Sequence, residues 1–368
     1  MVGFMFTKLT KKLDSFIKMG IPFYDCIVMK DGKCVYRHAS GYTDIKNKVK
    51  VTGKELYNIY SCTKLITCVA ALQLWERGVY SLEDKLSDYM PEFKEMTVRK
   101  GEAIEPAQKP ILIKHLFTMT AGFSYDLFSS QLIKCREETA GVCQTRETMK
   151  YLAKEPLLFE PGECWKYSLC HDVLAALVEV LSGMTFGEYV KRNIFEPLGM
   201  HRSTFLLDDS RLEEIVNQYE YCADKGIVEC DKTNGYKLGS EFESGGAGCI
   251  STVEDYIKFL EALRIGNVIL KEETIDMLAT NQLTKEQIQR SQQNIRSYWE
   301  KDYGYGLGQR CPQDDKKCDF GWGGAAGAYY AIDRKNNITF YLGVHVLDYA
   351  EFQDTRVEIL PIIQEIIK

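Results

Sequence analysis

Ser61-Cys62-Thr63-Lys64 runs directly into LITCVAALQLWERG at residues 65–78. Apolar side chains fall on most faces of the helix that this run predicts, as in a helix buried inside a large protein. Gly78 supplies the left-handed residue with which many helices end. Ser61 is therefore predicted at the start of a buried helix, with Lys64 one turn later on the same face.

Ser61 and Lys64 at this spacing suit nucleophilic catalysis. A serine hydroxyl becomes a good nucleophile when a base takes its proton. Burial and the positive end of a helix both disfavour a lysine ammonium ion, so Lys64 could act as that base. The N–H of Ser61 points out of the helix start, where it could help to hold an oxyanion. A single Ser-x-x-Lys is a weak signal, and it gains weight from two further segments.

The composition excludes several classes of protein. The chain has 368 residues, of which 45% are hydrophobic and 27% charged, as in globular proteins with a large core. The formal net charge of -6 argues against a nucleic-acid-binding surface. No apolar run reaches transmembrane length, and the first residues lack the apolar region of a signal peptide. We therefore expect a cytoplasmic protein without nucleic-acid or membrane partners.

The chain has 13 cysteines, which we expect to be reduced thiols. Their spacings lack the Cys-x-x-Cys pattern of zinc sites, and the five histidines form no His-Glu-x-x-His. We expect no metal and no cofactor.

Strand-like segments gather toward the two ends of the chain. Residues 23–29 and 33–38 predict a hairpin with its turn at Asp31-Gly32. Further strands are predicted at 303–310, 327–332 and 338–346. Helices are predicted to about residue 20 and at 82–89, 113–119, 172–181, 186–195 (ending at Pro197-Leu198-Gly199), 252–265 and 355–367, the last kinked at Pro361.

This order predicts an α+β fold. An antiparallel sheet formed from the N- and C-terminal segments would be flanked by helices and would carry an inserted, mostly helical lobe. Residues 1–80 and 235–368 would form the sheet lobe, and residues 81–234 the helical lobe. The active site would lie in the cleft between them.

Two further segments carry candidate site residues. PGECWKYSL at 161–169 leads into a predicted helix, and Tyr167 with a lowered pKa could shuttle the serine proton. The alternative for Tyr167 is a half-buried packing role. FGWGGAAG at 320–327 begins a predicted strand, with glycines that admit a substrate and the N–H of Ala325 as an oxyanion donor. The alternative is a glycine-rich bend before an edge strand.

The three segments, in this order, resemble the serine β-lactamase and penicillin-binding-protein superfamily. The resemblance is closest to its class C-like branch, which includes the family VIII esterases. It extends from about residue 20 to about residue 360 and includes IFEPLGM at 194–200, Ser244-Gly245-Gly246 and GYGLG at 304–308. The resemblance implies a β-lactamase/transpeptidase-like fold.

The resemblance also implies roles for particular residues. Ser61 would be acylated, and Lys64 and Tyr167 would move protons. Which of the two is the general base stays open. The N–H groups of Ser61 and Ala325 would form the oxyanion hole. The implied substrate-binding residues are Leu169, Trp322, Gly323 and Gly324.

Two departures from the family pattern bear on the substrate. Penicillin-recognising members carry Tyr-x-Asn, but Leu169 stands in the Asn position here. They also carry Lys-Thr-Gly, but this chain has Trp322-Gly323-Gly324. The missing amide and the missing cation favour small neutral esters over β-lactams or D-alanyl termini. We therefore expect a serine hydrolase that forms a covalent acyl-enzyme with a small acyl substrate. It would be a carboxylesterase or, with another acceptor than water, an acyltransferase.

Three alternatives stay open, and so does the oligomeric state. A β-lactamase or D-alanyl carboxypeptidase would need another anionic anchor, such as Arg310 or Lys166. A non-catalytic binding or scaffold protein would have no need for intact Ser61, Lys64 and Tyr167. A Ser-His-Asp hydrolase would need a Gly-x-Ser-x-Gly elbow, which GFSYD at 122–126 fails at its last position.

Residues close to the three segments have less defined roles. His171 and Asp172 would support the Tyr167 loop, or Asp172 would simply favour the start of a helix. The candidate walls of an acyl pocket are Tyr60, Tyr125 and Trp165.

Overall fold

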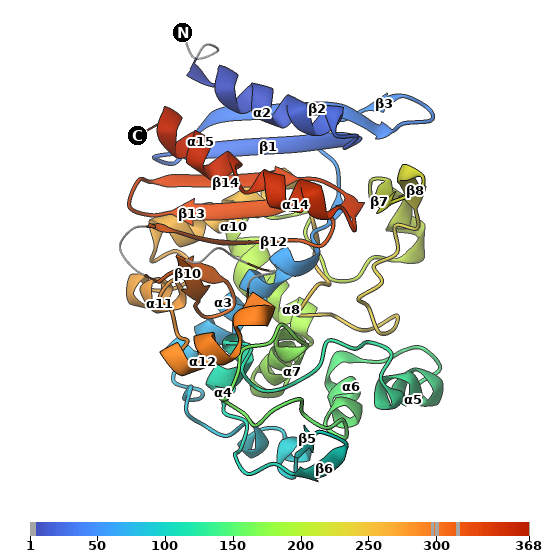
Figure 1. The fold of residues 1–368 in the computed structure, drawn as a ribbon, viewed down its shortest axis with the longest axis vertical. Coiled ribbons are helices and arrows are strands. Elements are labelled where there is room, and N and C mark those ends of the chain that lie inside the picture. The colour runs from blue at the N-terminus through green and yellow to red at the C-terminus, as the bar shows by residue number, and fades with distance from the viewer. Residues whose placement is uncertain (1–4, 296–297, 299–301, 314–316, 368) are drawn as a thin grey trace.

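The computed structural model describes residues 5–295, 298, 302–313 and 317–367. Within these residues, an eight-stranded antiparallel sheet has the order β10-β11-β12-β13-β14-β1-β2-β3. Its strands are β1 (Phe23–Lys30), β2 (Lys33–Asp44), β3 (Val49–Lys50), β10 (Tyr303–Tyr305), β11 (Arg310–Pro312), β12 (Asp319–Gly323), β13 (Tyr329–Asp333) and β14 (Ile338–Gly343). β1 pairs with β14, so the two ends of the chain meet in the middle of one sheet, as Figure 1 shows. The predicted α+β fold is confirmed.

Helices cover both faces of this sheet. α2 (Thr7–Lys18), α14 (Ala350–Arg356) and α15 (Ile359–Ile366) lie in front of it in Figure 1, and α10 (Val253–Ile265) lies behind it. β1 is buried along most of its length because it packs between these layers. The turn between β1 and β2 has positive φ at Asp31 (51°) and Gly32 (76°), as the predicted two-residue hairpin requires.

The central helix is buried all round, as its sequence predicts. A short 3₁₀ turn, η1 (Tyr60–Cys62), leads into α3 (Thr63–Glu76), whose residues from Thr63 to Leu74 are all buried. The N–H of Gly78 donates to the carbonyl of Trp75 at 2.9 Å, and Gly78 has a φ of 70°. The glycine therefore closes the helix in the left-handed conformation.

The helical part of the chain is built around α7 (Cys170–Ser182), which packs against α3. The predicted helices near 113–119, 172–181 and 186–195 are confirmed. The last of them ends within Pro197-Leu198-Gly199, as predicted, and Gly199 closes it with a φ of 65°. The other helices of this part are α4 (Ile113–Phe117), α5 (Ser130–Glu138), α6 (Thr145–Leu152), α8 (Phe186–Val190), η4 (Lys191–Phe195), α9 (Glu196–Leu198) and η5 (Asp209–Glu214).

The predicted helix at 82–89 is wrong. Only short 3₁₀ turns form there, η2 (Leu86–Asp88) and η3 (Pro91–Phe93). The backbone of this segment bonds to the chain near residue 112 instead, with the N–H of Leu86 donating to Ile111 and that of Ile113 donating to Asp84. Two hairpins in this part were not predicted, because their strands are short and show no clear alternation of buried and exposed residues. They are β5 (Thr97–Lys100) with β6 (Ala103–Pro106), and β7 (Gln218–Cys222) with β8 (Gly226–Cys230).

Three boundaries in the last third also differ from the prediction. The strand predicted at 303–310 is two strands, β10 and β11, separated by a turn in which Gly308 has a φ of 99°. Residues 320–323 form the end of β12, so they do not begin a strand as predicted. The next strand, β13, lies in the interior of the sheet, so the alternative of a bend before an edge strand is also wrong. The closing helix breaks between α14 and α15, and Pro361 lies in the first turn of α15, where its missing N–H costs nothing. The remaining elements are β4 (Tyr57–Asn58), β9 (Ile250–Ser251), β15 (Val346–Leu347), α11 (Glu272–Leu278), α12 (Lys285–Arg290) and α13 (Gln292–Ile295).

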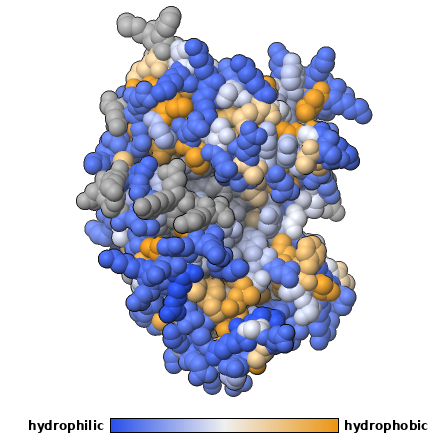
Figure 2. All heavy atoms as spheres, viewed as in Figure 1, coloured by the Kyte–Doolittle hydropathy of each residue, from blue (hydrophilic) through white to orange (hydrophobic). Residues whose placement is uncertain are grey.

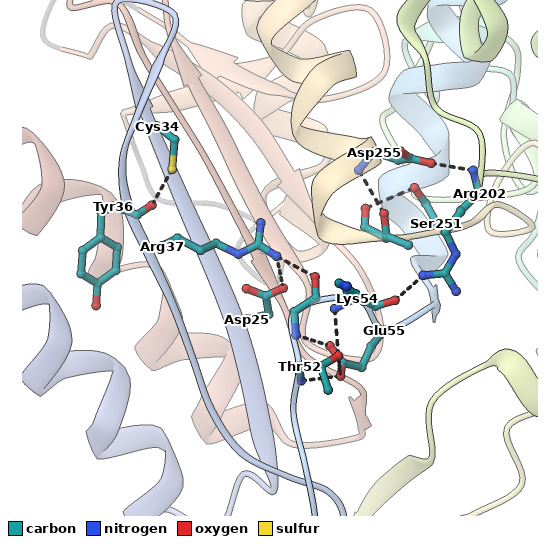
Figure 3. Close-up of polar contacts among 12 residues, drawn as sticks. Asp25, Cys34, Tyr36, Arg37, Thr52, Lys54, Glu55, Arg202, Ser251 and Asp255 are labelled. Carbon is teal, nitrogen blue, oxygen red and sulfur yellow. Dashed lines mark hydrogen bonds and ion pairs between the residues drawn. The ribbon is translucent and has the colours of Figure 1, made fainter.

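Polar contacts hold the segment that leads from the sheet to the central helix (Figure 3). Arg37 on β2 donates to Asp25 on β1 at 2.5 Å and to the carbonyl of Gly53 at 2.9 Å. The carboxylate of Glu55 accepts from the N–H groups of Thr52 (2.6 Å) and Gly53 (2.8 Å). These bonds fix the chain a few residues before η1, so they also fix the entry to the central helix.

No single helix in the described ranges is long and apolar enough to cross a membrane. One bent pair, Cys170–Ser182 with Phe186–Leu198, meets the length and composition criteria when its two members are taken together. The lobe boundaries at 80/81 and 234/235 stay a prediction.

Candidate active site

Ser61 lies in the 3₁₀ turn before α3, at the wall of a cavity of about 690 Å³. The residue before it, Tyr60, has a φ of 47°, a conformation that costs free energy for a bulky side chain. The Tyr60 hydroxyl donates to Gln218 at 2.5 Å, and its ring packs against Tyr236 at 5.7 Å. Tyr60 is thus buried behind the nucleophile, where it fixes the turn, and it does not line the cavity.

The structure brings Ser61, Lys64 and Tyr167 together. The Tyr167 hydroxyl donates to Ser61 Oγ at 2.7 Å, and Lys64 Nζ donates to the same atom at 3.3 Å. Lys64 Nζ also lies 4.5 Å from the centre of the Tyr167 ring. The Ser61 hydroxyl therefore has two proton-transfer partners within reach, as an activated nucleophile needs.

Burial lowers the pKa of Lys64 to about 8, although the nearby Asp172 carboxylate acts in the opposite direction. Lys64 Nζ donates to the carbonyl of Gly246 at 2.7 Å. Asp172 Oδ1 in turn accepts from Ser244 Oγ (2.6 Å) and from the N–H of Gly246 (3.2 Å). Asp172 therefore supports the loop that holds Lys64, not the loop of Tyr167. A substantial fraction of Lys64 is neutral near pH 8 and able to accept a proton.

The expectation of a lowered tyrosine pKa is wrong. Burial raises the pKa of Tyr167, even though its oxygen accepts a hydrogen bond from Trp322 Nε1 at 3.4 Å. Tyr167 is therefore a neutral hydroxyl at the pH of an enzyme assay, and it is a proton donor in the resting site. Lys64 is the better candidate for the first base, because burial moves its pKa toward neutrality.

The third segment, residues 320–327, packs beside the turn that carries Ser61. Ser61, Trp322, Gly323, Gly324 and Ala325 all line the cavity. The turn after β12 is closed by a bond from the N–H of Gly324 to Ala328 (2.8 Å), and no hydrogen bond described here uses the N–H of Ala325. A side chain at Gly324 would come within 2.6 Å of the carbonyl of Ile59, so glycine is required there. Ser61 and Ala325 thus line the same cavity, and the oxyanion role of their N–H groups stays a prediction.

Aromatic side chains form much of the cavity wall. Trp322 stacks on Tyr167 at 5.7 Å and on Tyr298 at 6.0 Å between ring centres. Tyr125, a predicted wall, lines the cavity and stacks on Tyr167 at 5.4 Å. Trp165, another predicted wall, is fully buried behind Tyr167 and does not line the cavity. The cavity therefore offers flat apolar surfaces beside the nucleophile.

Leu169 is not brought into this cavity. It lies buried at the start of α7, with its N–H donating to Ser124 at 3.2 Å, and it lines a separate, smaller cavity. Arg310, a candidate anionic anchor, lines the Ser61 cavity but is paired with Asp319 at 2.6 Å. Lys166, the other candidate, is not among the lining residues.

Several residues that line the cavity were not predicted from the sequence. They come from loops and from the C-terminal helices, far from any of the three segments, and include Tyr236, Tyr298, Asp348, Gln353 and Arg356. No local pattern marks them, because only the fold brings them to Ser61. On the face shown in Figure 2, hydrophilic side chains predominate and the molecule is hollowed between its sheet-bearing and helical parts.

The described residues contain no group of three His, Cys, Asp or Glu side chains that could hold a metal ion. All 13 cysteines are free thiols. The absence of a metal or cofactor stays a prediction.

Comparison with known proteins identifies the family. The family model described as Beta-lactamase matches residues 19–358. The chain belongs to the beta-lactamase family. Within the family, it is 28% identical to lovastatin esterase of Penicillium rubens, over 85% of this chain and 86% of that protein. It is 26% identical to acyltransferase calJ of Penicillium decumbens, over 88% of this chain and 84% of that one. Simvastatin synthase (LovD) from Aspergillus terreus shares the fold, with a TM-score of 0.83, 22% identity and 98% of each chain covered.

Membership of the beta-lactamase family confirms the resemblance stated from the three segments. The protein is a serine hydrolase, and its relatives include esterases and acyltransferases. Both activities expected from the sequence are thus represented among its relatives.

Proposed function

We propose that the protein transfers an acyl group from a small-molecule ester to water or to an alcohol, through an acyl-enzyme on Ser61. The observation that carries this proposal is the position of Ser61 Oγ, 2.7 Å from the Tyr167 hydroxyl and 3.3 Å from Lys64 Nζ. The aromatic walls of the cavity support an ester with an apolar acyl group or leaving group.

In the first half-reaction, neutral Lys64 takes the Ser61 proton as Oγ bonds to the carbonyl carbon. The carbonyl oxygen becomes an oxyanion, held by the N–H groups of Ser61 and Ala325. When the intermediate collapses, the carbon–oxygen bond to the leaving group breaks. The departing oxygen receives a proton from Tyr167, which regains one from the Lys64 ammonium. The products are the ester's alcohol and acylated Ser61.

In the second half-reaction, water or an acceptor alcohol enters the space that the leaving group vacated. Its proton passes to the Tyr167–Lys64 pair as its oxygen bonds to the acyl carbon. The bond to Ser61 then breaks, and Ser61 Oγ takes the proton back. The choice of acceptor decides whether the reaction is hydrolysis or acyl transfer, and the same residues serve both.

A neutral ester is the preferred substrate in this proposal. Trp322 occupies the position of the lysine with which penicillin-recognising members hold a carboxylate, and Arg310 is engaged by Asp319. A β-lactamase is the second candidate, because Arg356 also lines the cavity. We also propose that the protein is cytoplasmic and works without a metal, a cofactor or a nucleic-acid partner.

The test is hydrolysis of p-nitrophenyl acetate by the wild type and by Ser61→Ala, with a chromogenic cephalosporin assayed in parallel. We expect ester turnover that falls to background in Ser61→Ala, and little cephalosporin cleavage. An added primary alcohol should divert part of the acyl group to a new ester. Ser61-dependent cleavage of the cephalosporin at a higher rate than the ester would make the second candidate the function. Turnover of neither substrate would contradict the proposal.

A further inference from the structure

Arg356, on α14, is a buried cation beside the candidate oxyanion hole. Its side chain lines the Ser61 cavity, yet the residue is only 7% exposed. None of the ion pairs among the described residues uses it, and its Nε has no hydrogen-bond partner. Burial lowers the pKa of its guanidinium to about 10, so the group is still charged at neutral pH. The carboxylate of Asp354 favours this charge from a distance but forms no ion pair with it. A buried charge without a paired carboxylate is costly, which calls for a specific explanation.

The bonds that Arg356 does make all go to one turn. Nη1 donates to the carbonyl of Ala328 at 2.9 Å and lies 3.4 Å from that of Gly324. Gln353, one turn earlier on α14, donates to the carbonyl of Ala325 at 3.3 Å. Two side chains of α14 therefore hold the turn 324–328 from the side of its carbonyl groups.

The carbonyl of Gly324 and the N–H of Ala325 belong to the same peptide unit. A donor at the carbonyl oxygen increases the polarity of that unit and makes its N–H a stronger donor. A positive charge close behind it also acts on a developing oxyanion through a medium of low dielectric. Gly323 makes room for this arrangement, because a side chain there would collide with the guanidinium.

We propose that Arg356 is a positioning residue of the oxyanion hole, which aligns and polarises the Gly324–Ala325 peptide so that it stabilises the tetrahedral intermediate. This inference rests on the proposed function. A neutral side chain could hold the turn without the cost of a buried charge, so the charge itself is the property that the reaction uses. Arg356 touches no reacting atom in this scheme and acts through Ala325.

The test compares Arg356→Gln and Arg356→Met, which remove the charge, with Arg356→Lys, which keeps it. Lys317→Met is the matched control, since it removes a cation over the Tyr303 ring from the wall of the same cavity. Each variant is assayed with p-nitrophenyl acetate, and rates are divided by the fraction of Ser61 that a fluorophosphonate labels at end point. The carbonyl stretch of the acyl-enzyme is measured by infrared difference spectroscopy with a carbon-13 ester.

In both neutral variants we expect kcat per labelled site to fall about 10- to 100-fold, less than the loss of a complete donor, with KM changed less than about threefold. The acyl carbonyl stretch should move to higher wavenumber. Arg356→Lys should recover most of kcat, and Lys317→Met should leave the stretch unchanged. If Arg356→Met does not fold, the test rests on Arg356→Gln, because its amide can still donate a hydrogen bond to the carbonyl of Ala328.

Wild-type kcat per labelled site and an unchanged stretch in the neutral variants would overturn the inference, whatever their stability. That result differs from failure of the proposed function, in which the wild type itself shows no Ser61-dependent turnover.

Discussion

At the scale of single residues, one cause gives Lys64 and Tyr167 complementary roles. Burial disfavours the charged form of each, so it lowers the pKa of the lysine and raises that of the tyrosine. The resting site therefore tends toward a neutral amine and a neutral phenol on either side of Ser61. This is the state from which a lysine accepts a proton and a tyrosine supplies one.

The pH dependence of ester hydrolysis should report Lys64. Because only the neutral amine accepts the Ser61 proton, kcat/KM should rise with pH and level off above the Lys64 pKa of about 8. The measurement is kcat/KM between about pH 6 and pH 10 with a leaving group that does not titrate there. If kcat/KM instead levelled off near pH 6, or did not change with pH in this range, the base would be a group other than Lys64.

The buried Lys64 ammonium ion should also lower the free energy of unfolding near neutral pH. Its pKa is about 8 in the folded protein against 10.5 for the free side chain, so the unfolded chain binds the proton more tightly. The free energy of unfolding should therefore rise with pH between these two values, and below about pH 8 the buried ammonium destabilises the fold. Lys64→Met should be more stable than the wild type at pH 7 by roughly 2 kcal/mol, and less so at pH 10. Denaturant unfolding at both pH values, with Lys8→Met as exposed control, tests this. Equal or lower stability of Lys64→Met at pH 7 would contradict it.

At the scale of elements, the site depends on how α7 meets the loop at 244–246. Asp172, in the first turn of α7, holds Ser244 and Gly246, and Gly246 holds Lys64. The loop needs its glycines for this approach, because a side chain at Gly245 would meet the Cβ of Ala175 on α7 at 2.7 Å. Helix and loop therefore fix the lysine together.

Asp172→Asn should shift the pH profile without breaking this contact. The amide oxygen still accepts both hydrogen bonds, but the negative charge that raises the Lys64 pKa is gone. The alkaline limb of kcat/KM should move to lower pH, by up to about one unit. The same assay as for the wild type measures it. A shift to higher pH would show that Asp172 does not act on Lys64 by its charge.

The connection between β10 and β11 packs against the central helix at Gly308. This glycine has a φ of 99°, and a side chain there would collide with the sulfur of Cys68 on α3. Gly308→Ala should lower the free energy of unfolding by about 2 kcal/mol or more. Gly183→Ala is the control, because Gly183 has a φ of 70° with nothing near its Cβ position, so only the backbone term of about 1 kcal/mol applies. Equal losses in the two variants would mean that the contact with Cys68 carries no cost.

At the scale of the whole molecule, one hydrophobic core joins the sheet and the helices. The largest cluster of buried residues includes members of α2 near the start of the chain, of α3 and α7, and of α15 near its end. The proposed catalytic residues come from both parts of the fold, since Lys64 and Tyr167 lie with the helices and Ala325 follows a strand. The site is therefore complete only when sheet and helical part are folded together.

The two parts should unfold in one transition. Trp322 lies on β12 of the sheet, and Trp165 lies in the segment that leads into α7. Two variants that each keep only one of the four tryptophans, Trp322 or Trp165, should therefore give the same denaturant midpoint by fluorescence. The unmutated chain followed by circular dichroism is the control. Separate midpoints would show that the predicted lobes, 1–80 with 235–368 and 81–234, are independent folding units.

The sequence by itself determined the features that depend on neighbours along the chain. The all-round apolar run behind Ser61 specifies a buried helix, the spacing of Ser61 and Lys64 puts both on one face, and Asp31-Gly32 specifies the hairpin turn. The order of the three segments identified the family, which the comparison confirms. These features need no knowledge of distant contacts, because helix periodicity and turn conformation are local.

Only the tertiary structure decided which residues surround the nucleophile and in what state. Leu169 is two residues from Tyr167 yet faces another cavity, whereas Arg356 is almost 300 residues from Ser61 and lines the same one. The pKa of Tyr167 rises, against expectation, because burial by residues remote in sequence outweighs its polar contacts. Burial, and therefore charge state, depends on everything packed around a group, which no local stretch of sequence specifies.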